Sequence, residues 1–328
     1  MAVLDVSAAM QVVLDGFIAA LFNPLNRTYV LYLIPAALVA LLPLVRARRT
    51  KGLRRQLRAL GSGYFFSISS LIDVMLMILN VLLKALLLLP ILGTSLGVAI
   101  VIGSWLQDNI GDADLSIHLS VPIIALLFSL VLFLIDDGTR FLTHLAMHRV
   151  PFLWSLHKLH HSATVLTPLT IYRVHPLEST IYFARGVLSA GLVIGVFVWL
   201  FGRVLTGLEI LGVNAFGFLF NVAFANLRHS HIYLSFGPIE KYLISPAQHQ
   251  LHHSVDHEHA NLGSALALWD RLLGTWKPAS VRRRKLRFGV AESFFQLLQR
   301  ERVRQHGFNN QLSPIEYEEQ YEKRLSSV

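Results

Sequence analysis

The stretch HLAMHRVPFLWSLHKLHHS (residues 144–162) carries five histidines and follows closely on the apolar run HLSVPIIALLFSLVLFLI (118–135). A bilayer is crossed by about 20 helical residues, so the apolar run is long enough to span. A second histidine cluster, HQLHHS (249–254), stands later in the chain. The sequence therefore predicts membrane-crossing helices that carry histidine clusters near their ends.

The composition supports a membrane protein. Of the 328 residues 54% are hydrophobic and only 15% are charged, whereas soluble globular domains are about 25% charged. The predicted fold class is all-α, a polytopic integral membrane protein with a histidine-rich cap. The net charge of +9 comes from basic residues beside apolar runs, which is typical of cytoplasmic loops, so we expect no nucleic-acid partner. Cysteine is absent, which excludes disulfides and thiolate ligands.

Five apolar runs are candidate spans. The second is longer than one span requires and is interrupted by Lys84 and Pro90, so it is either one kinked helix or two shorter pieces. The fourth and fifth are joined by the short segment GRVLTG (202–207), which predicts a helical hairpin. A less apolar stretch, 8–22, is predicted to lie at the membrane surface. The five runs are 29–45, 74–106, 118–135, 180–201 and 204–225.

The loop charges predict an orientation. Seven Lys or Arg residues stand in 46–58, whereas 107–116 carries three Asp and no base. By the positive-inside rule the first loop is cytoplasmic and the second is outside, which places both histidine clusters on the cytoplasmic side. We expect a bacterial inner membrane rather than the endoplasmic reticulum. The predicted organisation is an N-terminal membrane region (1–117), a catalytic domain (118–280) and a cytoplasmic C-terminal tail (281–328).

The histidines are spaced for metal binding. His144 and His148 stand at positions i and i+4, and each later cluster has the pattern i, i+3, i+4. On a helix such residues share one face, so each cluster can direct its imidazoles to a common point. Pro151 predicts that the first pair and the second cluster lie on two helices that meet at a bend. The clusters are His157, His160 and His161, and His249, His252 and His253.

Imidazole suits Zn, Cu, Fe and Ni. Eight such ligands are too many for one tetrahedral zinc and enough for two metals. Thirteen of the 15 histidines fall between residues 144 and 259, so a chance grouping is a poor explanation. Further candidate metal ligands are His229, His175 and His259, and His231 and His257 could also serve as ligands or orient them.

Four segments resemble the fatty acid hydroxylase superfamily, also called the sterol desaturase family. The resemblance covers roughly residues 120–280 and rests on one HxxxH motif, two HxxHH motifs and the later WDRLxGT. The segments are DDGTRFLTHLAMHRVPFLWSLHKLHHS (136–162), YRVHPLE (172–178), LRHSHIYLSFGPIEKYLISPAQHQLHHS (227–254) and NLGSALALWDRLLGTW (261–276).

The resemblance implies a centre of two Fe ions held by the eight clustered histidines together with His229. It implies O2 as co-substrate and hydroxylation or desaturation of a membrane lipid, with sterol, fatty acyl, aminolipid and carotenoid substrates all open. The sequence shows no flavin, haem or iron–sulfur motif, so an external electron donor (a ferredoxin, cytochrome or reductase) is implied. Basic residues such as Arg283 and Arg284 are candidates for steering an acidic donor.

Asp137 and Asn261 are the candidate catalytic residues, and Asp137 in particular could accept a hydrogen bond from an imidazole. Three other functions are compatible with a histidine-rich membrane protein. A membrane zinc hydrolase needs fewer ligands and has an HExxH helix that is missing here. A metal transporter or metal-storage protein would place histidines along its spans. A bis-histidine haem protein needs only two facing histidines for each haem.

Overall fold

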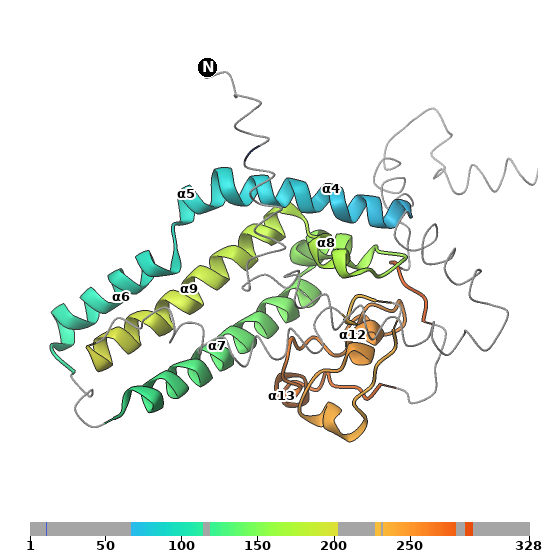
Figure 1. Cartoon of the computed structure of the whole chain (residues 1–328). Helices are drawn as coiled ribbons and strands as arrows, with labels where there is room; N and C mark the ends of the chain where they lie inside the picture. Colours follow the sequence, from blue (N-terminus) through green and yellow to red (C-terminus); the bar gives the residue numbers. More distant parts are fainter. Residues whose placement is uncertain are drawn as a thin grey trace, which may run out of the picture.

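The computed structural model describes Gln11 and residues 67–113, 119–202, 227–230, 232–279 and 286–290. Within these residues the chain is helical, and the extended pairing consists of two isolated bridges, Leu243–Leu266 and Ser254–Phe288. The predicted all-α class is confirmed (Figure 1). The α-helices are α4 (Ile68–Leu83), α5 (Leu89–Leu92), α6 (Ser95–Ile110), α7 (Val121–Arg149), α8 (Pro151–His161), α9 (Pro176–Phe201), α12 (Pro246–His252) and α13 (Leu268–Leu272).

Three helical segments are long and apolar enough to cross a membrane: Ile68–Ile110, Val121–Arg149 and Pro176–Phe201. They correspond to the second, third and fourth predicted spans, so the polytopic membrane fold is confirmed. The predicted spans 29–45 and 204–225, the surface stretch 8–22 apart from Gln11, and Arg283 and Arg284 lie outside the described residues.

The second apolar run forms two arms rather than one continuous span. Helix α4 continues through a π-helical turn, Lys84–Leu88, into α5, and the chain then turns at Gly93, whose φ is +70°. The Thr94 side chain caps the next helix by accepting from the Gly97 amide. Helix α6 therefore leaves the line of α4 and α5 at an angle and runs beside α9 (Figure 1).

Helix α4 buries polar side chains and exposes apolar ones, the reverse of a helix at the surface of a soluble protein. Its buried face carries Ser69, Asp73 and Asn80, whereas Leu71 and Met75 are 60% and 63% exposed. In water such exposed apolar side chains would be unfavourable, but facing lipid tails they are favourable, and the polar groups then belong inside the protein. The pattern is that of a helix in contact with lipid.

Glycines let α6 and α9 approach closely. A Cβ atom on Gly191 would lie 2.5 Å from the Val98 side chain, and one on Gly195 would lie 2.7 Å from the Ala99 carbonyl oxygen. Small residues four apart are a common means of packing helices in membranes, where close backbone approach replaces hydrophobic driving force. This contact holds the α6 arm against the rest of the bundle.

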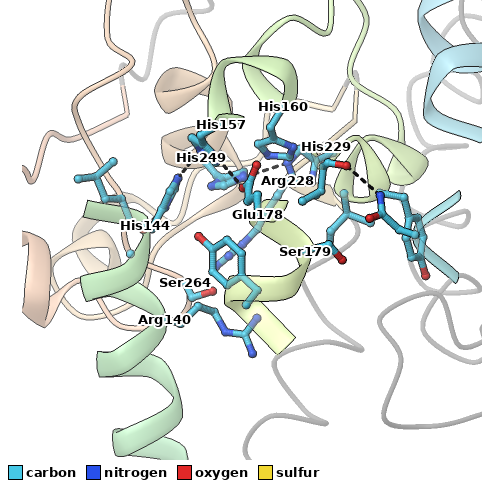
Figure 2. A pocket seen from close by; sticks show the side chains of 17 residues that line it. Arg140, His144, His157, His160, Glu178, Ser179, Arg228, His229, His249 and Ser264 are labelled. Atoms are coloured by element: carbon cyan, nitrogen blue, oxygen red, sulfur yellow. Dashed lines mark hydrogen bonds and ion pairs between the residues drawn. The ribbon is translucent and has the colours of Figure 1, made fainter. Parts of the chain in front are cut away.

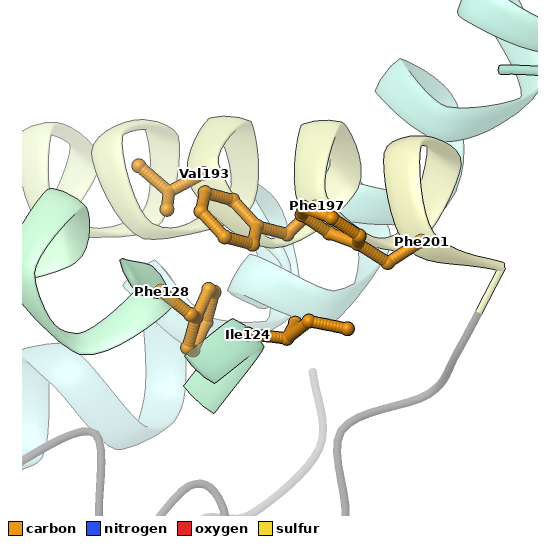
Figure 3. Close-up of a cluster of buried hydrophobic side chains, with 5 residues drawn as sticks. All are labelled: Ile124, Phe128, Val193, Phe197 and Phe201. Atoms are coloured by element: carbon orange, nitrogen blue, oxygen red, sulfur yellow. The ribbon is translucent and has the colours of Figure 1, made fainter. Parts of the chain in front are cut away.

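Helices α7 and α9 form an apolar core away from the histidines (Figure 3). Phe128 of α7 and Phe197 of α9 pack edge to face, with ring centroids 5.1 Å apart. Ile124, Val193 and Phe201 complete the cluster. Aromatic pairs in this arrangement add favourable energy beyond the apolar area that they bury.

Helix α7 extends well past the predicted span. Its 29 residues give a length of about 43 Å at 1.5 Å per residue, against about 30 Å for the hydrocarbon core of a bilayer. The final turns, with His144 and His148, therefore project toward the cap. Val150 ends the helix and Pro151 starts α8, so the predicted bend at Pro151 is confirmed.

Candidate metal centre

Three short helical segments and one turn bring nine histidines together. The end of α7 supplies His144 and His148. The short helix α12 starts at a capping box, in which Ser245 accepts from the Gln248 amide and the Gln248 side chain accepts from the Ser245 amide. This box fixes where the helix that carries the third histidine motif begins. The other contributors are α8 and the turn at 227–230.

The nine histidines form two groups, in each of which the candidate ligand atoms all lie within 4.8 Å of one another. We call them cluster 1 and cluster 2. Each HxxHH motif divides between them: its first and last histidines enter one cluster and its middle histidine enters the other. Cluster 1 is His144, His148, His157, His161 and His252, and cluster 2 is His160, His229, His249 and His253.

The two clusters adjoin. The rings of His161 in cluster 1 and His253 in cluster 2 are stacked, with centroids 4.7 Å apart. Within cluster 1 the Nε2 atoms of His144 and His157 are 3.1 Å apart. Two nitrogens that bind one ion at about 2.1 Å and at right angles are separated by about 3.0 Å, so this spacing fits shared coordination.

Eight of the nine imidazoles are buried, and His144 is half-buried. Burial is the main cause that lowers the pKa of His157 and of His160 to about 3. Burial and the neighbouring histidines hold the pKa values of His161, His252 and His253 well below their ordinary range. Neutral imidazole is the form that binds metal ions, so these side chains are ready to act as ligands at neutral pH.

Several ring nitrogens in the clusters lack a hydrogen-bond partner despite their burial. They include both nitrogens of His148 and the Nε2 atoms of His161 and His252. A buried polar atom without a partner costs about 1–3 kcal/mol. A metal ion would satisfy one nitrogen of each ring, and the all-imidazole donor set suits Fe. The residues present thus fit a two-metal centre.

Four ligand rings are oriented by acceptors behind them. His157 Nδ1 donates to Glu178 Oε1 over 2.6 Å, and His144 Nδ1 donates to the Leu262 carbonyl over 2.7 Å. His160 Nδ1 and His252 Nδ1 donate to the carbonyls of Arg173 and Ala260. With Nδ1 protonated, Nε2 is the atom left for a metal. The sequence analysis missed Glu178, although a charge that opens an apolar run was a signal for it.

Asp137 does not contact an imidazole, in contrast to the expectation. Its Oδ1 accepts from the Ala265 amide over 2.8 Å, and its Oδ2 accepts from the Leu266 amide and from Trp269 Nε1. Both oxygens are thus occupied in holding the 262–269 loop to α7. This loop includes Leu262, whose carbonyl accepts from His144.

Asn261 also lies outside both clusters. It adopts a φ of +55°, a region that asparagine tolerates better than most residues. Its Oδ1 accepts from the Lys277 backbone amide, and its own backbone N–H donates to the Thr275 carbonyl. The side chain therefore shapes the loop before Leu262 rather than facing a metal.

Of the remaining candidate ligands in the described residues, His229 belongs to a cluster and His175 and His259 do not. His229 lies in cluster 2, and its Nε2 is 3.0 Å from that of His253. His175 caps α9, because its Nδ1 accepts from the Leu177 amide. The His259 side chain is 63% exposed, with its ring centroid 5.8 Å from that of His148. Neither His175 nor His259 belongs to a cluster, and His231 is outside the described residues.

A cavity of about 270 Å³ opens beside both clusters (Figure 2). His144 and His157 of cluster 1 and His160, His229 and His249 of cluster 2 all line it. Figure 2 shows Arg140 at the end of the drawn site away from His160. The cavity gives a small molecule or part of a larger one access to both clusters. Its other lining residues include Asn80, Tyr172, Glu178, Ser179, Tyr182 and Arg228.

The family model described as fatty acid hydroxylase matches residues 129–275, a range that contains every histidine of both clusters. Residues 129–275 match a fatty acid hydroxylase domain. The resemblance noted in the sequence is thereby confirmed. No solved structure matches the chain at a significant level.

The curated relatives that this chain resembles are lipid-modifying enzymes by name. An ornithine lipid hydroxylase, OlsE, of Rhizobium tropici is 29% identical over 141 residues, which are 42% of this chain and 38% of that protein. An alkylglycerol monooxygenase of Danio rerio is 27% identical over 142 residues, 42% of this chain and 28% of that protein. The human alkylglycerol monooxygenase is 26% identical over 136 residues, 41% and 27% respectively. The match thus covers less than two fifths of each relative.

Proposed function

We propose that the protein is a membrane-bound di-iron oxidoreductase that uses O2 and external electrons to hydroxylate a C–H bond of a lipid. The observation that carries the proposal is the pair of adjoining clusters of imidazoles, eight of the nine buried, beside one cavity. The fatty acid hydroxylase match over residues 129–275 and relatives named as a lipid hydroxylase and monooxygenases support it. When bound, the irons would supply the O2 chemistry that protein side chains lack.

The chain's own part is to hold, orient and shield. The five ligands of cluster 1 and the four of cluster 2 would each hold one ion. Glu178 and the carbonyls behind His144, His160 and His252 keep those rings in one tautomer and one orientation. Burial of most of the ligands would keep water from the metal side of the cavity, which would limit side reactions there.

The proposed reaction consumes one lipid, one O2, two electrons and two protons, and it yields a hydroxylated lipid and one water. The electrons must come from a separate donor, which we propose to be a ferredoxin, a cytochrome or a reductase. The printed names of the relatives support a lipid as substrate. We further propose that the clusters face the cytoplasm and that the membrane is a bacterial inner membrane.

The rival functions fit the site less well. Cluster 1 offers five histidines, whereas a zinc hydrolase uses three protein ligands and a water. A transport pathway would need ligands along the spans, but His144 and His148 occupy only the last turns of α7. Two haems would use four histidines, which leaves five of the nine without a role.

Metal content tests the proposal. The full chain is expressed with iron supplied, purified in mild detergent and analysed for elements beside a His157→Ala/His160→Ala/His161→Ala variant. Two irons for each chain, lost in the variant, are expected because that motif serves both clusters. A single zinc, or no metal even after anaerobic reconstitution with Fe(II), would overturn the proposal. Lipids from producing cells are then searched for the mass gain of one oxygen atom.

A further inference from the structure

One segment, residues 167–178, supports the α8 histidines, and we call it the support strap. The Arg173 carbonyl accepts from His160 Nδ1 over 3.3 Å, and the Glu178 carboxylate accepts from His157 Nδ1. The Arg173 guanidinium donates over 3.1 Å to Ser162, the residue that ends α8. The strap thus contacts ligand rings of both clusters and the end of the helix that carries them.

The support strap is fastened to α4 by a buried ion pair. Asp73 Oδ1 accepts from Arg173 Nε over 2.6 Å, and Asp73 Oδ2 accepts from the hydroxyls of Thr170 at 2.9 Å and Thr167 at 3.4 Å. The Asp73 side chain is fully buried and that of Arg173 is 3% exposed. The carboxylate therefore holds the strap at three points.

Two further residues of α4 take part. Arg173 Nη2 donates to the Ser69 carbonyl and, over 2.8 Å, to the Ser69 hydroxyl. Asn80 Nδ2 donates to the Val174 carbonyl over 2.8 Å while also bonding to Leu76 in its own helix. Three residues on one face of α4 thus hold the two residues that come directly after the turn of 168–172.

A buried ion pair is weak evidence for stability, because removing two charges from water costs about as much as their attraction returns. The cost is greater here because Asp73 stands in a helix whose other face carries exposed apolar side chains. The best attested use of such pairs is to fix one arrangement of the chain. The arrangement fixed here is the position of the Arg173 peptide, whose carbonyl orients His160.

From these contacts we infer that Asp73 and Asn80 of α4 are positioning residues for the metal centre. They act through Arg173 and Val174 of the support strap on the α8 histidines. Both lie outside the range matched by the family model, residues 129–275. The N-terminal membrane region thereby contributes to the site rather than only anchoring it. The inference rests on the proposed function, because it presumes that the clusters bind metal.

Metal affinity tests the inference without measuring turnover. The full chain in detergent is stripped of metal and titrated anaerobically with Fe(II), and separately with Co(II), whose visible absorption reports the ligand arrangement. Asp73→Asn and Asn80→Leu are each expected to weaken metal binding about 10- to 100-fold, the range found when groups behind metal ligands are removed. The Co(II) absorption is expected to change as well.

Asp136→Asn is the control. Asp136 is a carboxylate of another spanning helix, and it pairs with Arg140 at 3.0 Å and Arg185 at 2.8 Å without touching the strap. Its substitution is expected to leave metal affinity unchanged, and thermal unfolding of the metal-free proteins monitors the fold. Asp73→Asn leaves the buried Arg173 without its carboxylate, whereas Asn80→Leu leaves no unpaired charge. The metal affinity of Asn80→Leu therefore tests the inference if Asp73→Asn fails to fold.

The outcomes are distinguishable. If both variants fold and bind metal as the unmodified chain does, the inference is overturned while the proposed function stands. If Asp136→Asn weakens binding equally, the effect is a general loss of stability and the inference is also overturned. If the unmodified chain binds no metal, the proposed function fails and the inference falls with it.

Discussion

Glu178 Oε1 lies 2.6 Å from His157 Nδ1, and the two side chains are 2% and 4% exposed. The carboxylate is held at the first turn of α9, and the imidazole is near the end of α8. The start of a spanning helix is thereby joined to a ligand of cluster 1. This contact fixes the ring so that Nε2 faces the cluster.

Glu178→Gln should weaken metal binding and slow turnover by about 10- to 100-fold. The amide keeps the size of the carboxylate but makes a weaker hydrogen bond to His157, which lowers the basicity of the ligand. Iron retention during dialysis against a chelator measures the effect. Ser179→Ala, a change at the neighbouring cavity residue, is the control. Equal iron retention in Glu178→Gln and the unmodified chain would contradict a role for this contact.

Single alanine substitutions should separate the two clusters. His161→Ala removes a ligand of cluster 1 and His160→Ala a ligand of cluster 2, so each should lower the metal content from about two ions toward one for each chain. The ion that remains in His161→Ala and the ion that remains in His160→Ala should differ in their Mössbauer spectra, because cluster 1 has five histidines and cluster 2 has four. Identical spectra in the two variants would contradict the assignment of these neighbours to different clusters.

His259→Gln should leave the metal content unchanged. Its side chain is 63% exposed and lies outside both clusters, so its substitution removes no metal ligand. Elemental analysis beside His148→Gln gives the comparison, since His148 is a buried member of cluster 1. Loss of one ion in His259→Gln would show that the exposed ring moves in to bind metal.

The metal-free protein should lose stability as the pH falls below about 6.5. The unfolded chain protonates its histidines near that pH, whereas burial lowers the pKa of His157 and of His160 to about 3 in the folded chain. The unfolded state then binds more protons, so the free energy of unfolding falls through this window. Each such histidine contributes about 1.4 kcal/mol for each pH unit.

Thermal unfolding of the metal-free protein between pH 7 and pH 4 measures this slope. The His157→Ala/His160→Ala/His161→Ala variant should show a shallower slope, because it lacks three buried neutral imidazoles. A slope as steep as that of the unmodified chain would place the titrating groups elsewhere.

Gly191→Leu should destabilise the bundle by about 1–3 kcal/mol, the usual cost of overpacking. Even a Cβ atom there would lie 2.5 Å from the Val98 side chain. Gly186→Ala, on the same helix, is the matched control because nothing lies within 4 Å of its Cβ position. Thermal unfolding in detergent compares the two variants, and similar midpoints would argue against close packing of α6 and α9.

The spacing of histidines and the position of Pro151 in the sequence predicted much of the metal centre. The i, i+3, i+4 spacing and the bend at Pro151 depend on helix geometry alone, so the histidine groups and the meeting of α7 with α8 could be predicted. The division of each motif between two clusters could not, because it depends on how α8 and α12 face each other. That relationship is tertiary and leaves no mark on the spacing.

Buried carboxylates were harder to interpret. Asp137 was expected beside an imidazole because it precedes His144 by seven residues, yet it holds the loop of Ala265 and Leu266 instead. Glu178 and Asp73, which do support the clusters directly or through the strap, stand far from the histidines in sequence. Hydrogen bonds between distant segments depend on the tertiary fold, so these carboxylate contacts could not be predicted from the spacing of residues in the sequence.

Helix α7 is continuous from Val121 to Arg149, so it fixes the distance between its membrane-embedded end and its histidine end. One end of this rod is embedded with the α9 aromatics, and the other carries His144 and His148. Under the proposed function, the height of the centre above the bilayer midplane is set by helix length rather than by a flexible loop. The carbon atom that is oxidised would then be counted from the lipid headgroup, and a thinner or thicker bilayer would shift the product along the chain.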